Sequence, residues 1–186
     1  NLKVEINYSL RNHILPIVKK KVNAAFLQLD SEIKTLSTLE LFGSKIKALI
    51  ERTAPRDLYD IHNMLKYNVI PPDEMDMLRK IVLFYLAVGG NNKPSINYRF
   101  ESIDNLKFAE IRSSLLPVLK KSERFNFELA KVEVKTFLLK LMTFTEDEKL
   151  FIEHFNKKEY QPDLLFEDTE IIESIKNHPM AIWKMR

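Results

Sequence analysis

The stretch KIKALIERTAPRDLYD, residues 45–60, contains the densest set of charged side chains at regular spacing in the sequence. Lys45, Ala48 and Arg52 are three and four residues apart, so on a helix they lie along one stripe. A neighbouring apolar stripe can pack on a core and consists of Ile46, Leu49 and Ile50. Arg56 and Asp60 repeat the four-residue spacing. The pattern predicts an amphipathic helix whose charged side faces outward.

Pro55 divides this stretch into two helices, because its ring removes a hydrogen-bond donor and clashes with the preceding turn. We expect the first helix to run to about Arg52 and the second to about Tyr67. Pro55 would lie in the first turn of the second helix, with Thr53 as its N-cap. The break is expected to bring three charged residues together at one junction, Arg52, Arg56 and Asp57.

The residues before this stretch predict a small amount of β-structure. Apolar and polar residues alternate over residues 2–9, which is the period of a half-buried strand. Residues 11–30 show no clean period and indicate a loop, whereas residues 32–36 suit a second strand. Ser37 and Glu40 then have the spacing of a capping box and predict the start of the first helix.

The residues after it are helical in pattern. Helices are expected over residues 73–88, 103–115 and 126–142, the first of them ended by Gly89 and Gly90. A second capping box, Thr145 with Glu148, opens another helix. The sequence therefore predicts an α+β fold that is predominantly helical, with a few strands followed by a helical bundle.

Composition narrows the class of protein. A chain of 186 residues with 45% hydrophobic and 30% charged residues is typical of a globular protein and not of a disordered one. No apolar run approaches the roughly 20 residues that span a bilayer, so we expect no membrane partner. The absence of cysteine excludes thiolate metal sites and fits a cytoplasmic location. A formal net charge of +3 is compatible with RNA or nucleotide binding, without indicating it strongly.

The complete charged string, Lys-x-x-Ala-x-x-x-Arg-x-x-x-Arg-Asp-x-x-Asp, resembles the third conserved motif of the AbiEii/AbiGii-type nucleotidyltransferase toxins. These form a branch of the minimal nucleotidyltransferase superfamily. The match covers six residues without a gap, namely Lys45, Ala48, Arg52, Arg56, Asp57 and Asp60. It implies that residues 1–68 are the C-terminal part of a nucleotidyltransferase domain, with a strand remnant of its sheet, and that residues 69–186 form a helical domain.

The resemblance also implies a reaction and a set of roles. A nucleoside monophosphate would pass from a nucleoside triphosphate (NTP) to an acceptor, with tRNA as the expected acceptor and Mg²⁺ as the cofactor. Lys45 would contact the triphosphate, and Arg52 and Arg56 would bind phosphate or position the acceptor. Asp57 and Asp60 would orient those cations or the metal shell. The remaining implied components are a metal-ligating carboxylate on the first strand, Glu5, and an antitoxin encoded beside the gene.

One departure bears on activity. The family's first motif, a Gly-rich turn with Ser and two nearby Asp residues, is missing from the sequence, so we expect a fragment that is inactive alone. The end of the chain, from His178-Pro179 to Trp183-Lys184, resembles the family's C-terminal pattern, and a terminal helix anchored by one aromatic is favoured over a contact of Trp183 with substrate. Two alternatives stay open: a non-catalytic helical module that binds RNA or a protein, and a purely structural scaffold with a solvated charged face.

Overall fold

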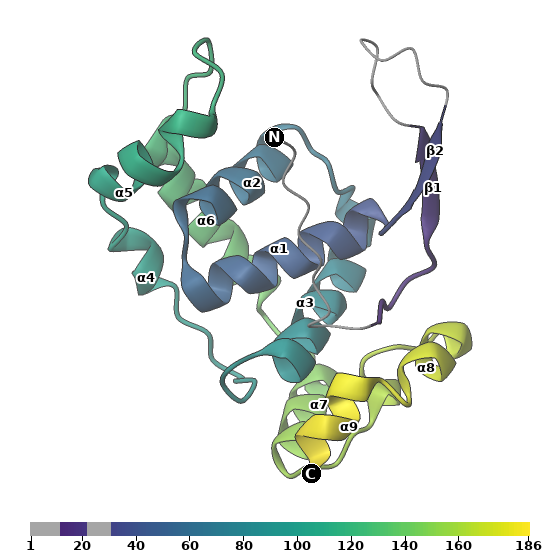
Figure 1. Cartoon of the computed structure of the whole chain (residues 1–186). Coiled ribbons are helices and arrows are strands. Elements are labelled where there is room, and N and C mark those ends of the chain that lie inside the picture. The colour runs from purple at the N-terminus through teal and green to yellow at the C-terminus, as the bar shows by residue number, and fades with distance from the viewer. Residues whose placement is uncertain (1–11, 22–30) are drawn as a thin grey trace.

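Four helices form the centre of the molecule, and a β-hairpin lies at its edge (Figure 1). The computed structural model describes residues 12–21 and 31–186. Helices α1 (Thr38–Arg52), α2 (Pro55–Lys66), α3 (Met75–Gly89) and α6 (Phe127–Leu141) pack together, with α1 lying along α3 and α2 lying on α1 and α6. The predicted fold class, α+β and predominantly helical, is confirmed.

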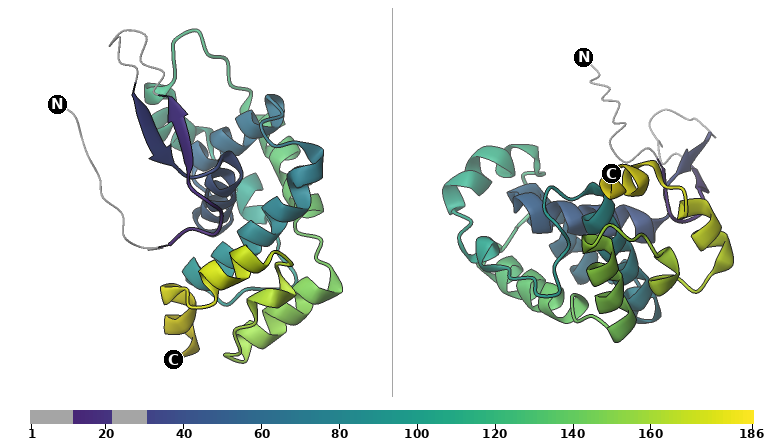
Figure 2. Two further views of the ribbon diagram at one scale, coloured as in Figure 1. Left: turned by 90° about the vertical axis from the view of Figure 1, so that its right-hand side faces the viewer. Right: turned by 90° about the horizontal axis from the view of Figure 1, so that it is seen from below.

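The hairpin pairs β1 (Val18–Lys21) with β2 (Glu32–Thr35) in antiparallel register, with Val18 opposite Thr35. The strand predicted from residue 32 is confirmed, but the loop predicted over residues 11–30 is wrong at β1. Lysine-rich strands are unusual, and these lysines are tolerated because β1 is exposed along most of its length. Both views in Figure 2 show the hairpin outside the helical body. The strand predicted over residues 2–9, with Glu5, lies outside the described residues.

The start of α1 confirms one half of the predicted capping box. The Ser37 hydroxyl accepts a hydrogen bond from the Glu40 N–H at 3.1 Å, as an N-cap does. The Glu40 side chain does not return to Ser37. Its fully buried carboxylate instead accepts the main-chain N–H groups of Ile14, at 2.7 Å, and Leu15, at 3.1 Å, and the hydroxyl of Tyr85. Glu40 therefore ties the segment before the hairpin to α1 and α3.

The junction between α1 and α2 is sharper than expected. Thr53 is not the N-cap of α2 but ends α1 in the left-handed conformation, with φ 46° and ψ 49°. Its N–H donates to the Leu49 carbonyl at 3.0 Å, which closes the last turn of α1. Ala54 is the N-cap of α2, and Pro55 begins the helix as predicted. A β-branched residue with positive φ is strained by about 1–3 kcal/mol, so the rest of the fold holds this turn in place.

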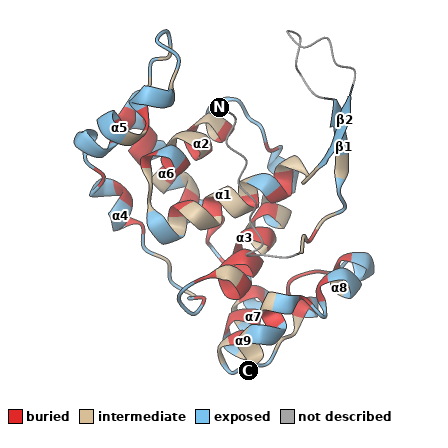
Figure 3. Ribbon diagram, viewed as in Figure 1, coloured by how far each residue is buried: buried red, intermediate tan, exposed pale blue. Residues whose placement is uncertain are grey.

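Helix α3 is the central element of the core. Every residue from 81 to 88 is buried, which is typical of a helix surrounded on all sides. Helix α1 approaches it closely at Gly43, where an added Cβ would stand 2.4 Å from the Cγ2 atom of Ile81. One hydrophobic core includes residues on both sides of residue 68. The predicted division into residues 1–68 and residues 69–186 therefore stays a prediction. Figure 3 shows the buried residues gathered along α3 and the helices that face it.

The single helix predicted over residues 103–115 is wrong. Two short helices, α4 (Glu101–Asp104) and α5 (Phe108–Ser114), replace it and are followed by a 3-10 turn, η2 (Leu116–Val118). The break occurs because Glu110 accepts the N–H of Lys107 at 3.1 Å, which starts a new helix at that point.

The C-terminal helices gather at one end of the molecule, away from α4 and α5 (Figure 1). They are α7 (Glu146–Asn156), α8 (Thr169–Ile175) and α9 (Pro179–Met185), and α9 packs on α3. The capping box predicted at Thr145 and Glu148 is confirmed. Along the described chain, no helix combines the length and apolar composition needed to cross a bilayer.

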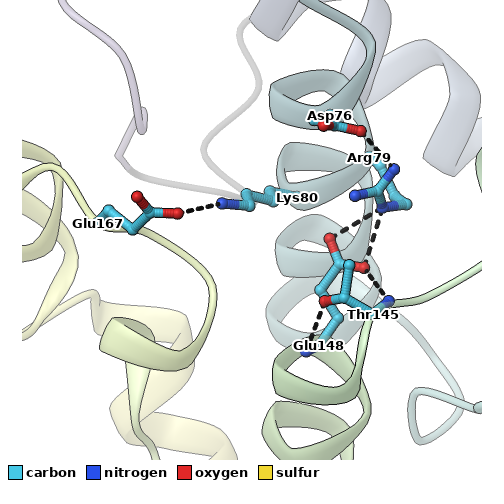
Figure 4. A network of polar contacts seen from close by, with 6 residues as sticks. All are labelled: Asp76, Arg79, Lys80, Thr145, Glu148 and Glu167. Atoms are coloured by element: carbon cyan, nitrogen blue, oxygen red, sulfur yellow. Dashed lines mark hydrogen bonds and ion pairs between the residues drawn. The ribbon is translucent and has the colours of Figure 1, made fainter.

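A polar network fastens α7 to α3 (Figure 4). Arg79 of α3 donates from Nε to both carboxylate oxygens of Glu148, at 2.9 Å, and from Nη1 to Asp76 at 2.8 Å. The Glu148 side chain is only 1% exposed and also caps α7 by accepting the Thr145 N–H. Burial lowers the pKa of Arg79, but its bonds to Glu148 and Asp76 outweigh that effect, so Arg79 stays charged.

Candidate functional site

The first charged pair of the motif joins α1 to α2. Lys45 lies in α1 and Asp60 in α2, and the Nζ of Lys45 stands 2.5 Å from the Oδ2 of Asp60. Both side chains are 35% exposed, so the pair is open to solvent on one side. An ammonium has three N–H donors, and this contact uses one of them. Asp60 therefore orients the Lys45 ammonium and leaves it free to meet an anion.

The second pair is bidentate. Arg52 donates from Nε to the Oδ2 of Asp57 at 2.6 Å and from Nη2 to its Oδ1 at 2.7 Å. The Asp57 side chain is 6% exposed, whereas that of Arg52 is 67% exposed. The hydrogen bonds to Asp57, together with its charge, raise the pKa of the Arg52 guanidinium. A buried carboxylate thus holds an exposed guanidinium in a fixed orientation.

Arg56 points elsewhere. Its Nε donates to the main-chain oxygen of Ser114, at the end of α5, at 2.8 Å. The predicted cluster of three charged residues at the junction is therefore found for Arg52 and Asp57, while Arg56 fastens α5 to α2.

A pocket of about 340 Å³ lies beside Asp60. Arg56, Tyr59 and Asp60 form one wall, on a single face of α2. The opposite wall comes from the connection after α5 and combines apolar with charged side chains, Leu115, Val118, Leu119, Lys120 and Glu123. The Tyr59 hydroxyl donates to the Oε1 of Glu123 at 2.8 Å, which joins two residues of the lining, and burial raises the pKa of Tyr59.

Tyr59, Lys120 and Glu123 were not found by the sequence analysis. Tyr59 carried a usable signal, because Arg56, Tyr59 and Asp60 have the spacing of one helical face. Glu123 carried none, because it lies 64 residues from Tyr59 in the sequence and approaches it only in the folded chain.

The described residues do not form a metal site. No group of three or more acidic or histidine side chains that could hold an ion occurs among residues 12–21 and 31–186. Asp57 is engaged by Arg52, and Asp60 is engaged by Lys45. Glu5, the predicted metal ligand, lies outside the described residues. His62 packs edge-on against Phe125, with its Nε2 3.2 Å from the Oε2 of Glu133.

Comparison with known families decides what kind of protein carries this arrangement. A model of the AbiEii nucleotidyl transferase toxins of type IV toxin–antitoxin systems matches residues 1–163. The chain belongs to the AbiEii family. The match includes both charged pairs and ends before α8 and α9, so the expected likeness of residues 178–184 to the family stays a prediction. No curated protein and no solved structure matches the AbiEii chain.

Proposed function

We propose that the AbiEii chain supplies the phosphate-binding side of a nucleotidyl transfer from an NTP to an RNA acceptor, with tRNA as the expected acceptor. The observation that carries the proposal is the pairing of Lys45 with Asp60 and of Arg52 with Asp57. In both pairs a carboxylate of α2 fixes a cation of α1, and that cation remains exposed to solvent.

Lys45 is proposed to contact the triphosphate. Transfer breaks the bond between the α- and β-phosphates and releases pyrophosphate, so negative charge develops on the leaving group. A compact ammonium beside those oxygens stabilises that charge. Asp60 holds the ammonium in place beforehand, which reduces the cost of arranging it during the reaction.

Arg52 is proposed to bind phosphate or to position the acceptor, with Asp57 as its positioning residue. The fork of Arg52 can hold two phosphate oxygens only if its plane is fixed, and the bidentate bond to Asp57 fixes it. Asp57 is nearly buried and therefore acts through Arg52 and not by touching the substrate.

The pocket beside Asp60 is proposed to hold the base or the sugar of a substrate. The apolar side chains in its lining suit the face of a ring, and Arg56 suits a phosphate. The main-chain bond of Arg56 to Ser114 leaves other guanidinium N–H groups for that contact.

The family reaction implies Mg²⁺, but the described residues do not form a site that fits this ion. Glu5 remains the proposed metal ligand. We further propose that residues 1–186 alone do not catalyse the transfer, that the protein acts in the cytoplasm, and that an antitoxin encoded beside the gene is its genetic partner.

The proposal is tested with the complete protein, an NTP labelled at the α-phosphate and tRNA. Lys45→Ala should abolish transfer and leave the melting temperature within about 2 °C of wild type, because half-exposed ion pairs stabilise little. Lys149→Ala is the matched control. Its side chain is 37% exposed and pairs with Glu146 at 2.6 Å, and it should keep full activity. A folded Lys45→Ala protein that transfers at the wild-type rate would refute the assignment.

A further inference from the structure

A second pocket, of about 220 Å³, lies where three helices end. It is formed by the connection after α3, the end of α7 and the helix α9. Three lysines line it, Lys93, Lys158 and Lys184. None of its lining residues, all of which are described, is acidic. Three cations around one small pocket without a carboxylate indicate a site for an anion.

Each of the three lysines already contacts a main-chain oxygen, and none of these partners is a carboxylate side chain. The Nζ of Lys184 donates to the Gly90 oxygen at 2.7 Å, that of Lys93 to the Asn156 oxygen at 3.4 Å, and that of Lys158 to the Arg186 oxygen at 2.7 Å. The Gly90 and Asn156 oxygens lie at the ends of α3 and α7 and carry only the partial negative charge of a helix C-terminus, so they offset only part of the charge of the lysines that they contact. Each ammonium also keeps two further N–H donors.

Two carboxylates close to the pocket, Glu51 and Glu159, already have partners. Glu51 accepts the main-chain N–H of Asn91 at 3.2 Å, but its other oxygen pairs with Lys47 at 2.5 Å. Glu159 follows Lys158 in the sequence and contacts the Nδ1 of His154 at 2.5 Å. Within the described residues, neither carboxylate forms an ion pair with Lys93, Lys158 or Lys184, so the three ammonium groups keep charge for an anion.

Lys158 has a strained backbone in a position that normally favours glycine. Its φ is 67°, in the left-handed region. Its N–H donates to the Phe155 oxygen at 3.0 Å, and the Glu159 N–H donates to the His154 oxygen at 2.9 Å. These two bonds define a Schellman motif, whose left-handed residue is usually glycine. A lysine there lowers stability, which suggests that its side chain has another use.

An aromatic ring stands beside one of these cations, Lys184. Trp183 of α9 is 60% exposed, although tryptophan is usually largely buried. The Lys184 ammonium lies 5.8 Å from the centre of its ring. A flat exposed ring next to bound phosphate is the arrangement by which proteins hold single-stranded nucleic acid.

We propose that this pocket binds a backbone phosphate of the RNA acceptor through Lys93, Lys158 and Lys184, and that an adjacent unpaired base stacks on Trp183. The inference rests on the proposed RNA acceptor but names a contact outside the charged motif. RNA is the proposed ligand because a free phosphate has no base that could stack on the exposed ring of Trp183.

The decisive variant is Lys158→Gly, in which stability and binding change in opposite directions. Relief of the left-handed strain should raise the melting temperature by about 2–4 °C. Loss of one phosphate contact should weaken binding of a fluorescent single-stranded RNA 12-mer about fivefold at 0.1 M salt and lower the salt slope by about 0.7. Asn68→Gly is the matched control, because Asn68 has φ 47° at the end of α2, and it should leave RNA affinity unchanged.

Further variants and ligands distinguish an RNA phosphate from the phosphate of a nucleotide or of pyrophosphate. Lys93→Ala, Lys184→Ala and Trp183→Ala should each weaken RNA binding, whereas Lys140→Ala, at an exposed site of α6, should not. ATP and pyrophosphate are tested as separate ligands. If the variants weakened the binding of ATP and pyrophosphate but not that of RNA, the RNA assignment would be overturned. If the variants bound RNA, ATP and pyrophosphate as tightly as wild type, the pocket would be overturned as a binding site. These assays need no transfer reaction, so an inactive protein would contradict the proposed function without affecting their outcome.

Discussion

Removal of Arg52 provides a quantitative test of its pairing with Asp57. In Arg52→Ala the Asp57 carboxylate, 6% exposed, loses both of its hydrogen bonds to the guanidinium. Breaking a fully buried ion pair costs about 3–5 kcal/mol. The Arg52 side chain is 67% exposed, so water enters where the guanidinium stood and the cost falls to about 2 kcal/mol. For a chain of this length that corresponds to a fall of about 4–8 °C in melting temperature.

The double variant Arg52→Ala/Asp57→Asn measures how much of this cost comes from the unpaired charge of Asp57. Because asparagine removes the stranded charge, the double variant should be more stable than Arg52→Ala alone, with a coupling free energy of about 1–2 kcal/mol. Urea unfolding of wild type, both single variants and the double variant measures this coupling. A melting temperature of Arg52→Ala within about 1 °C of wild type, or a double variant less stable than Arg52→Ala, would refute the proposed role of Asp57.

Three further perturbations test the fold around the site. Arg79→Ala leaves Glu148 buried without its partner and should cost about 3–5 kcal/mol in urea unfolding; a loss below about 1 kcal/mol would contradict the network. Burial lowers the pKa of His178, so the unfolded chain binds more protons, and stability should fall as the pH drops below about 6.5. Thermal melts from pH 8 to 5 should therefore show a smaller loss for His178→Asn than for wild type, and equal losses would exclude His178 as a cause. Gly43→Ala places a Cβ 2.4 Å from Ile81 and should cost about 1–3 kcal/mol, whereas unchanged stability would show that α1 and α3 separate easily.

Local signals in the sequence located the ends of α1, α2, α3 and α6 to within about two residues. Pro55 and the capping pair at Thr145 act on neighbouring residues, so their effects were predictable from the chain alone. The failures arose where distant residues compete. Glu40 has the right spacing to cap α1, but the buried hydroxyl of Tyr85, 45 residues away, and the N–H of Ile14 take its carboxylate instead.

The candidate site was predictable in its composition but not in its geometry. Helical spacing placed Lys45 and Arg52 on one stripe, whereas their pairing with Asp60 and Asp57 depends on the angle between α1 and α2. That angle is set by the left-handed backbone of Thr53, which no residue preference predicts. Lys93, Lys158 and Lys184, which line the second pocket, come from three separated segments, so no spacing in the sequence indicated that they would meet.

The most direct test of the central claim follows the two ends of the triphosphate separately. The complete protein is incubated with tRNA and with NTPs labelled either at the α- or at the γ-phosphate. We predict that the α-label becomes part of the RNA while the γ-label is released as pyrophosphate, and that both signals disappear in Lys45→Ala. Transfer of the γ-label to RNA or protein, or no incorporation of the α-label with any of the four NTPs, would contradict nucleotidyl transfer.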